Sequence, residues 1–321
     1  MAKISNRQSL ILEYLENNPE SRNSKIKSFL ESRLNEEFGR VTIVRDLDRL
    51  LKQKLVIREG KGRNVTYSMA IKKPLLKFFD IESYFVNNQD QRDAKYPRFN
   101  FEIYSNLNEL FNQEELKKVN KLNNNYLKRI KKLSPTVIKK EFERLTIDLS
   151  WKSSQIEGNT YSLIDTEILI KQNKPAEGHN QEEAIMILNH KKALDHVINN
   201  QQKFKRVNFR DIENLHGLLV DQLNVTKGFR KNLIGITGTN YQPLNNQHQI
   251  KEAIEKLVKA INQIKSPIEK ALISAVMIAY IQPFEDGNKR TSRLLANAVL
   301  LANNYCPYRL EVLARRSIKK L

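Results

Sequence analysis

The chain has 321 residues, of which 40% are hydrophobic and 28% charged, and this excludes a disordered protein and leaves room for two domains. Its formal net charge of +19 favours polyanionic partners, because lysine and arginine neutralise phosphates, although a merely solvated basic surface is the alternative. The most apolar run, Ala271 to Ile281, is too short to span a bilayer, and the single Cys306 excludes an internal disulfide. We therefore expect a cytoplasmic protein with no membrane partner.

Residues 1–73 are expected to form three helices and a short β-ribbon. Apolar residues recur at helical spacing up to Leu15 and again from Ser24 to Leu34, and a third helix is expected from Thr42 as its N-cap. Two strand-like stretches, Leu55–Arg58 and Val65–Met69, follow on either side of a basic, glycine-rich turn. The pattern predicts a small module that ends in a hairpin.

This order of elements resembles the winged helix-turn-helix modules of bacterial regulators. The resemblance implies that the third helix and the turn bind double-stranded DNA. The side chains expected to contact it are Arg45, Arg49 and Lys52 on the helix and Lys61 and Arg63 on the turn. The alternative is a protein-binding module of the same shape, whose positive charge is incidental.

The rest of the chain is expected to be mainly helical. Residues 74–140 form a charged helical connecting region, in which Asn87 to Arg98 is an exposed loop, and residues 141–321 form the second domain. In that domain Asn232 to Tyr241 is the one strand-like stretch. Apolar periodicity and caps predict these helices: 136–155, 162–171, 182–199, 209–219, 249–263, 268–280 and 289–303.

The segment between the last two of these helices has the composition of an anion site. One helix ends at Pro283, a tight turn contains Asp286 and Gly287, and a new helix begins near Asn288. The first amides of a helix have no partner within it, and together with the helix dipole they attract phosphate.

Charged side chains complete this anion site. Arg290 and Arg293 lie three residues apart, on one face of the helix, where their guanidinium groups can hold phosphate oxygens. Asp286 offers a carboxylate suited to Mg²⁺ shared with phosphates. The pattern predicts a cradle for Mg-ATP, against the alternative of a helical bend with chance arginines.

Residues 282–293, Gln-Pro-Phe-Glu-Asp-Gly-Asn-Lys-Arg-Thr-Ser-Arg, resemble the signature of the Fic family, His-Pro-Phe-x-Asp-Gly-Asn-x-Arg-x-x-Arg. Every defined position matches except the first. The resemblance implies a Fic-type helical domain that transfers AMP from Mg-ATP to a Ser, Thr or Tyr hydroxyl of a target protein or of itself. It also implies the roles of individual residues: Asp286 for Mg²⁺, Asn288 with the amides of Gly287 and Lys289 for the α-phosphate, and Arg290 and Arg293 for the outer phosphates.

Two further stretches resemble elements of the same family. The first, Lys227–Arg230 followed by Ile234–Pro243, looks like a β-hairpin flap that holds a target segment by strand addition, with its centre at Ile236, Thr237, Gly238 and Thr239. The second, Ser153 to Gly158, resembles the inhibitory motif Ser/Thr-x-x-x-Glu-Gly/Asn. That resemblance implies that Glu157 pairs with Arg293 and displaces the γ-phosphate. The alternative is a surface glutamate before a glycine that ends the helix.

Gln282 stands where the family has the histidine that takes the proton of the attacking hydroxyl. A glutamine amide takes up no proton at neutral pH, and a general base contributes roughly 10²–10⁴-fold. The substitution predicts a severe loss of transfer while nucleotide binding is retained. Two hypotheses stay open: an AMP-transferase inhibited by Glu157, and a DNA-binding regulator whose degenerate Fic domain senses nucleotide or mediates formation of a homodimer.

Overall fold

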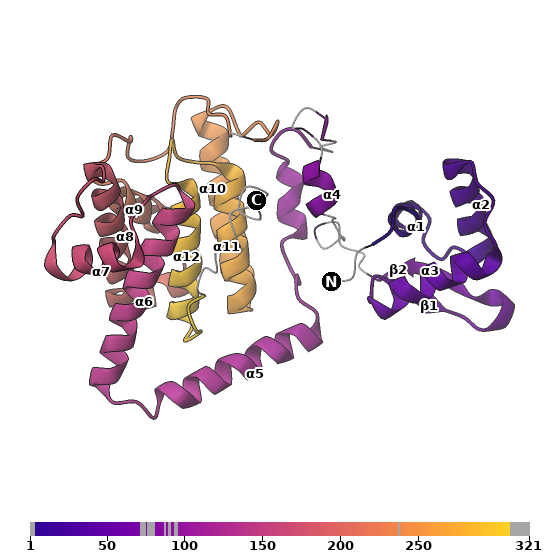
Figure 1. The fold of residues 1–321 in the computed structure, drawn as a ribbon, viewed down its shortest axis with the longest axis horizontal. Coiled ribbons are helices and arrows are strands. Elements are labelled where there is room, and N and C mark those ends of the chain that lie inside the picture. Colours follow the sequence, from indigo (N-terminus) through magenta and orange to yellow (C-terminus); the bar gives the residue numbers. More distant parts are fainter. Residues whose placement is uncertain are drawn as a thin grey trace. The chain divides into compact units, whose positions relative to one another are not determined.

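A computed structural model of the chain describes residues 4–70, 75, 81–86, 88, 91–92, 96–236 and 238–308. The chain divides into two compact units, Met1–Asn87 and Asn88–Leu321 (Figure 1). The finer domain boundaries expected after residues 73 and 140 stay predictions. Among the described residues, no helix is both long enough and apolar enough to cross a membrane.

The first unit contains the three helices and two strands expected from the sequence: α1 (Asn6–Asn17), α2 (Asn23–Leu34), α3 (Arg40–Lys52), β1 (Val56–Glu59) and β2 (Thr66–Met69). It also contains α4 (Ile81–Val86), which falls in the expected connecting region. The two strands are antiparallel, with Val56 opposite Met69 and Glu59 opposite Thr66. Their turn contains the short 3₁₀ helix η1 (Gly62–Asn64) and depends on Gly60, where an added Cβ would lie 2.2 Å from the Asn64 carbonyl oxygen.

The start of α3 differs from the prediction. Gly39, in an extended conformation, is the N-cap, and the Thr42 amide already donates to the Gly39 carbonyl at 3.0 Å. Thr42 therefore lies in the first turn and not before it. The core of the unit comes from buried apolar side chains of all three helices and β1: Ile11, Leu15, Ile26, Leu30, Ile43, Leu47, Leu50 and Val56.

One charged residue of α3 faces this core. The carboxylate of Asp46 is buried and accepts a hydrogen bond from the Gln8 amide group at 3.0 Å, and it forms an ion pair with Arg7. Because both partners come from α1, this contact fastens α3 to α1. A buried carboxylate has to be paired in this way, since leaving it unpaired costs several kcal/mol, roughly.

The second unit is a helical bundle. Its elements are η4 (Phe101–Asn106), α5 (Gln113–Ile130), α6 (Pro135–Ile156), α7 (Leu163–Gln172), α8 (Gln181–Asn199), η5 (Gln201–Lys205), α9 (Phe209–Leu219), α10 (Gln247–Gln263), α11 (Pro267–Ile281) and α12 (Asn288–Ala302). The predicted helices of residues 136–303 are all present, with ends that differ by at most two residues. Local signals set these ends, such as the Ser162 capping box of α7 and the prolines that open α6 and α11.

α11 and α12 form the centre of the bundle and lie side by side (Figure 1). α10 packs on α11, while α6, α8 and α9 pack on α12. From Leu294 to Ala302 every residue of α12 is buried, so this helix runs through the core. Its first turn, where Asn288 begins the helix, is therefore held on a rigid support.

α5 is a long, solvent-exposed helix that crosses one end of the bundle (Figure 1). Its polar side chains fasten it to the end of α12: the Asn123 side chain bonds the Asn304 carbonyl and the Cys306 amide, and Tyr305 donates to Asn120. This helix belongs to the connecting region expected from the sequence. Half of the expected loop Asn87 to Arg98 lies outside the described residues.

The flap was expected to be a β-hairpin, and this prediction is wrong for the described residues of 232–241. They form no strand, and the nearest pairing is a single parallel bridge between Arg98 and Gln242. Among the described residues, the backbone of Leu233 to Ile236 has no hydrogen-bonded neighbour. A strand-like sequence forms a ladder only when a second strand is present to pair with it.

Candidate functional site

The loop between α11 and α12 is shaped by two residues with positive φ. Gln282 caps α11 at φ 52°, and its amide donates to the Ile278 carbonyl at 3.0 Å. Gly287 caps α12 at φ 77°, and a Cβ there would lie 3.3 Å from Val220. Pro283 prevents α11 from continuing. The chain therefore turns sharply in this loop and leads directly into the start of α12.

The loop is anchored by a buried aromatic stack. Phe284 is fully buried and lies parallel to the His216 ring of α9, with 3.7 Å between ring centroids. His216 Nε2 donates to the Asp286 carbonyl at 3.1 Å, which places the proton on Nε2. Burial lowers the pKa of His216 to about 4, so the ring is neutral at pH 7. Nothing in the sequence around His216 indicates that this residue supports the loop.

Asn288 closes the loop through its side chain. Its Oδ1 accepts from the Phe284 amide at 2.9 Å, and its Nδ2 donates to the Phe284 carbonyl at 2.8 Å. The side-chain amide of Asn288 therefore stabilises the loop through both of its polar atoms. By contrast, the backbone amides of Asn288, Lys289 and Arg290 donate to no described residue. These three amides are the groups that a helix N-terminus offers to an anion.

Asp286 and Arg290 form an ion pair, with 2.7 Å between Oδ2 and Nη2. The carboxylate is exposed, whereas the guanidinium is 1% exposed and its Nη1 also approaches the Leu219 carbonyl at 3.5 Å. The buried Arg290 Nε has no partner among the described residues. Arg290 therefore lies beneath the loop, and its predicted contact with the outer phosphates stays a prediction.

The donor set around Asp286 fits Mg²⁺ as an ion that is shared with phosphates. Among the described residues no cluster of three or more His, Cys, Asp or Glu side chains could hold a metal ion alone. Mg²⁺ in nucleotide sites typically takes one or two carboxylates and completes its shell with phosphates and water. One exposed carboxylate beside three unpaired amides fits such a shared ion.

Arg293 joins α12 to the end of α6. Its Nη2 lies 2.6 Å from Glu157 Oε1 and 3.1 Å from both the carbonyl and the hydroxyl oxygen of Ser153, while its Nε donates to that hydroxyl at 3.2 Å. The guanidinium is 13% exposed and the Glu157 carboxylate 22%. The structure thus brings together the second arginine of residues 282–293 and both polar residues of the predicted motif.

The end of α6 fixes Glu157 in place. Glu157 is the C-cap, and Gly158 follows at φ +100°, a conformation that glycine adopts without strain. The Asn159 amide closes the turn on the Ser154 carbonyl at 3.1 Å, and the Asn159 side chain donates to the Glu183 carbonyl at 2.9 Å. These hydrogen bonds attach the turn to α8 and so fix the position of Glu157 at the end of α6.

A buried histidine lies close to Arg293. His190 of α8 approaches Ser150 with 3.4 Å between Nδ1 and Oγ. Burial, and then the charges of Arg293 and Arg290, lower the pKa of His190 to about 3. Because this imidazole stays neutral, it adds no positive charge to the two arginines.

Gln282, at the position of the absent histidine, is 7% exposed. Its Nε2 donates to the Ala279 carbonyl at 2.6 Å, so the side chain folds back on its own helix. The predicted place beside an attacking hydroxyl stays a prediction.

The flap region borders a hollow of about 730 Å³, lined from one side by Phe99 and Phe101 and from the other by Leu233 to Gly235. Ile236 is half-buried, Gly238 accepts at its carbonyl from Arg92 at 2.8 Å, and the Thr239 hydroxyl accepts from the Tyr241 amide at 3.2 Å. Thr237 lies outside the described residues. The segment is thus anchored near 238–242, while the backbone of 233–236 is open.

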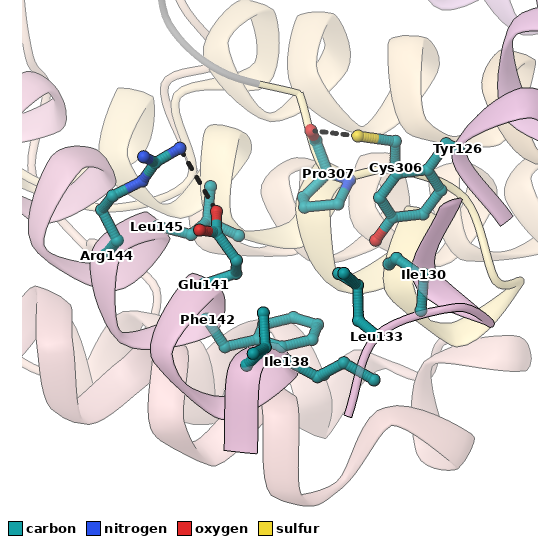
Figure 2. Close-up of a pocket in the computed structure, with 11 residues that line it drawn as sticks. Tyr126, Ile130, Leu133, Ile138, Glu141, Phe142, Arg144, Leu145, Cys306 and Pro307 are labelled. Carbon is teal, nitrogen blue, oxygen red and sulfur yellow. Dashed lines mark hydrogen bonds and ion pairs between the residues drawn. The ribbon is translucent and has the colours of Figure 1, made fainter. Parts of the chain in front are cut away.

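A second hollow, of about 310 Å³, lies between α5 and α6 and is closed on one side by Cys306 and Pro307 (Figure 2). Its lining is mainly apolar, with Glu141 and Arg144 as an ion pair at the edge. No residue of 282–293 lines it. It is a feature separate from the loop described above.

The five cations expected to contact DNA all lie on the surface of the first unit. Arg45, Arg49 and Lys52 are exposed on α3, and Lys61 and Arg63 are exposed in the β1–β2 turn. None of them takes part in an ion pair with a described residue. Their charge is therefore available to a partner.

Comparison with known proteins finds similarity within the second unit. Residues 206–300 match the family model described as Fic/DOC family. The protein adenylyltransferase Fic of Nematostella vectensis is 29% identical over 166 residues, which cover 49% of this chain and 38% of that protein. The corresponding protein of Drosophila melanogaster is 26% identical over 160 residues, 49% of this chain and 32% of its own length. The chain spans well under half the length of these relatives.

Two solved structures share the fold. Fic-1 of C. elegans superposes with a TM-score of 0.52 at 21% identity, over 61% of this chain and 59% of that one. A Fic domain containing signaling protein from Bacteroides thetaiotaomicron gives a TM-score of 0.53 at 23% identity, over 60% of this chain and 75% of that one. The second unit of this chain therefore has the fold of these two structures, and its residues 206–300 match the Fic/DOC family model.

Proposed function

We propose that the second unit binds Mg-ATP at the N-terminus of α12 and transfers AMP to a hydroxyl group of a protein. The unpaired amides of Asn288, Lys289 and Arg290 would receive the α-phosphate and its neighbours. The relatives named protein adenylyltransferase support ATP as the substrate and a protein as the target. The target hydroxyl belongs to a Ser, Thr or Tyr residue, on another protein or on a copy of this chain.

The observation that carries the proposal is the ion pair between Arg293 and Glu157. A guanidinium on the helix that carries these amides is suited to the γ-phosphate, and here a carboxylate already binds it. Glu157 would therefore compete with the γ-phosphate and leave ATP misplaced for transfer. Positioning of reacting groups is worth up to about 7–11 kcal/mol of a barrier, so a misplaced phosphate is an effective inhibitor of transfer.

Asp286 is the residue that would hold Mg²⁺ in this complex, together with the ATP phosphates. Bound there, the ion would offset negative charge that builds up on the phosphates. The ion pair between Asp286 and Arg290 keeps the carboxylate at the edge of the cradle. A Mg²⁺ ion would then share this carboxylate with Arg290.

The open backbone of Leu233 to Ile236 supports a target bound by strand addition. An extended segment without a paired neighbour offers amides and carbonyls to a second strand. Gln282 limits the reaction that follows, because its amide cannot take the proton of the target hydroxyl. Phosphoryl chemistry draws much of its rate from positioning and charge, so a slow residual transfer is expected.

The exposed cations of the first unit favour a second function, binding of double-stranded DNA by a winged helix-turn-helix module. α3 would lie in the major groove and the β1–β2 turn would contact the backbone. Combined with Gln282, this gives the alternative protein: a cytoplasmic transcription regulator in which the Fic/DOC domain senses nucleotide or mediates homodimer formation. The enzyme and the nucleotide-sensing regulator both require nucleotide binding at α12. A regulator whose Fic/DOC domain only mediates dimerisation does not.

Calorimetric titration of Mg-ATP into the full chain tests the shared part of the proposal. Binding is expected in the wild-type protein and more tightly after Glu157→Gly. If neither protein binds Mg-ATP, the α12 N-terminus is not a nucleotide site.

A further inference from the structure

The flap and the loop between α11 and α12 are both hydrogen-bonded to one buried side chain, Arg230. Its guanidinium is 1% exposed, and each of its nitrogens donates to a different backbone carbonyl. Nε donates to Gln282 at 2.7 Å, Nη1 to Asn232 at 2.8 Å and Nη2 to Leu244 at 2.6 Å. The Arg230 amide adds a fourth bond, to the Pro283 carbonyl at 3.0 Å.

These bonds connect three parts of the chain. Asn232 and Leu244 stand at the two ends of the flap region, and Gln282 with Pro283 forms the first peptide of the loop before α12. The Gln282 backbone has a positive φ, which is uncommon for a non-glycine residue and has to be held by its surroundings. Two of the four bonds hold the carbonyl groups of Gln282 and Pro283, which directly follow this strained backbone position.

The Arg230 charge has no carboxylate as its partner among the described residues. Carbonyl dipoles alone neutralise it, and burial lowers the pKa of the guanidinium. A buried cation is costly in free energy, and a core built only for stability would use an apolar residue there. Arginine provides something an apolar residue does not: a planar fork whose donors point in several fixed directions.

We infer that Arg230 is a positioning residue that holds the flap and the loop at Gln282 as one unit, so that a target segment and the nucleotide are placed relative to each other. This inference rests on the proposed function, because it gives the flap a target and the loop a nucleotide. Lysine cannot replace this arginine, since a single ammonium group cannot reach three divergent carbonyls at once.

Hydrogen exchange of backbone amides, measured by mass spectrometry on the full chain, tests the inference. Arg230→Lys keeps the charge and loses the fork, and Arg230→Met keeps much of the volume and loses both. Lys231→Gln, at the exposed neighbouring position, is the matched control. Each Arg230 variant is expected to speed exchange at least tenfold in peptides that cover 231–244 and, together with them, in peptides that cover 282–288. The control should leave both unchanged.

A second arm separates positioning from simple support of the fold. In a Glu157→Gly background, Mg-ATP is expected to slow exchange in 282–288 and also in 231–244. With Arg230→Lys the slowing should be confined to 282–288. If Mg-ATP alters nothing anywhere, the proposed nucleotide site fails, and the first arm still decides the role of Arg230.

Three results would overturn the inference. The first is faster exchange in only one of the two segments. The second is Mg-ATP protection that still reaches the flap in Arg230→Lys. The third is global loss of the fold in both Arg230 variants, which would make Arg230 a general core residue.

Discussion

Arg293 and Glu157 are 136 residues apart in the sequence, yet Nη2 of one lies 2.6 Å from Oε1 of the other. Ser153, one helical turn before Glu157, binds the same guanidinium. The end of α6 thereby binds Nε and Nη2 of Arg293. A ligand that needs Nη2 has to displace the carboxylate first.

Glu157→Gln should tighten the binding of Mg-ATP by about 10- to 100-fold. This range corresponds to roughly 1.5–3 kcal/mol, the usual worth of a hydrogen bond to a charged group. The matched control is Glu167→Gln, which removes an exposed ion pair with Lys171 on α7. Calorimetry measures both. Equal affinities for Glu157→Gln and the wild-type protein would show that the ion pair does not compete with nucleotide.

Stability should fall as the pH is lowered from 6.5 toward 4. Burial depresses the pKa of His216 to about 4 and of His190 to about 3, against 6.5 for a free histidine. In this window the unfolded chain takes up protons that the folded chain does not. The free energy of unfolding therefore drops by about 2 kcal/mol for each histidine between pH 6.5 and 5.

Urea unfolding at pH 7 and pH 5 measures this effect. His216→Gln should make the pH dependence shallower, because it removes one of the two depressed groups. His248→Gln, at an exposed position of α10, is the control and should retain the wild-type dependence. An unchanged dependence in His216→Gln would contradict the assignment of a neutral, buried His216.

Charge reversal at Arg45, Arg49, Lys61 and Arg63 should weaken binding to double-stranded DNA and make it less sensitive to salt. Each lost phosphate contact is expected to reduce the slope of log affinity against log salt by about 0.9. Lys203→Glu, on η5 of the second unit, changes the net charge as much as any one of these reversals, at an exposed position, and should have no such effect. Fluorescence anisotropy between about 50 and 200 mM salt provides the measurement. No binding at low salt would leave the first unit with another role.

The sequence predicted the helices well because their signals are local. Apolar periodicity, the Ser162 cap and the prolines at the starts of α6 and α11 act within one or two turns of the chain. The ends of the loop at residues 282–288 were predictable for the same reason. Proline stops one helix, and Gly287 provides the positive φ that starts the next.

Features that depend on distant contacts were not predictable. Asp46 looks like a surface residue in the pattern of α3 and is buried only because Arg7 and Gln8 reach it. Arg290 looks like a phosphate ligand in the motif but is covered by α9 and its own loop. The flap looks like a strand, but without a partner its residues form no ladder.

The central claim is AMP transfer limited by two separate residues, and incorporation of label from ATP into protein tests it most directly. The wild-type chain, Glu157→Gly, Gln282→His and the double variant are each incubated with α-labelled ATP and Mg²⁺. In the proposed function Glu157 controls how the nucleotide lies, and Gln282 lacks the proton acceptor, whose contribution to the rate is roughly 10²–10⁴-fold. The double variant is therefore expected to label itself or a partner far faster than either single variant. A wild-type chain that transfers AMP as fast as the double variant would contradict the account.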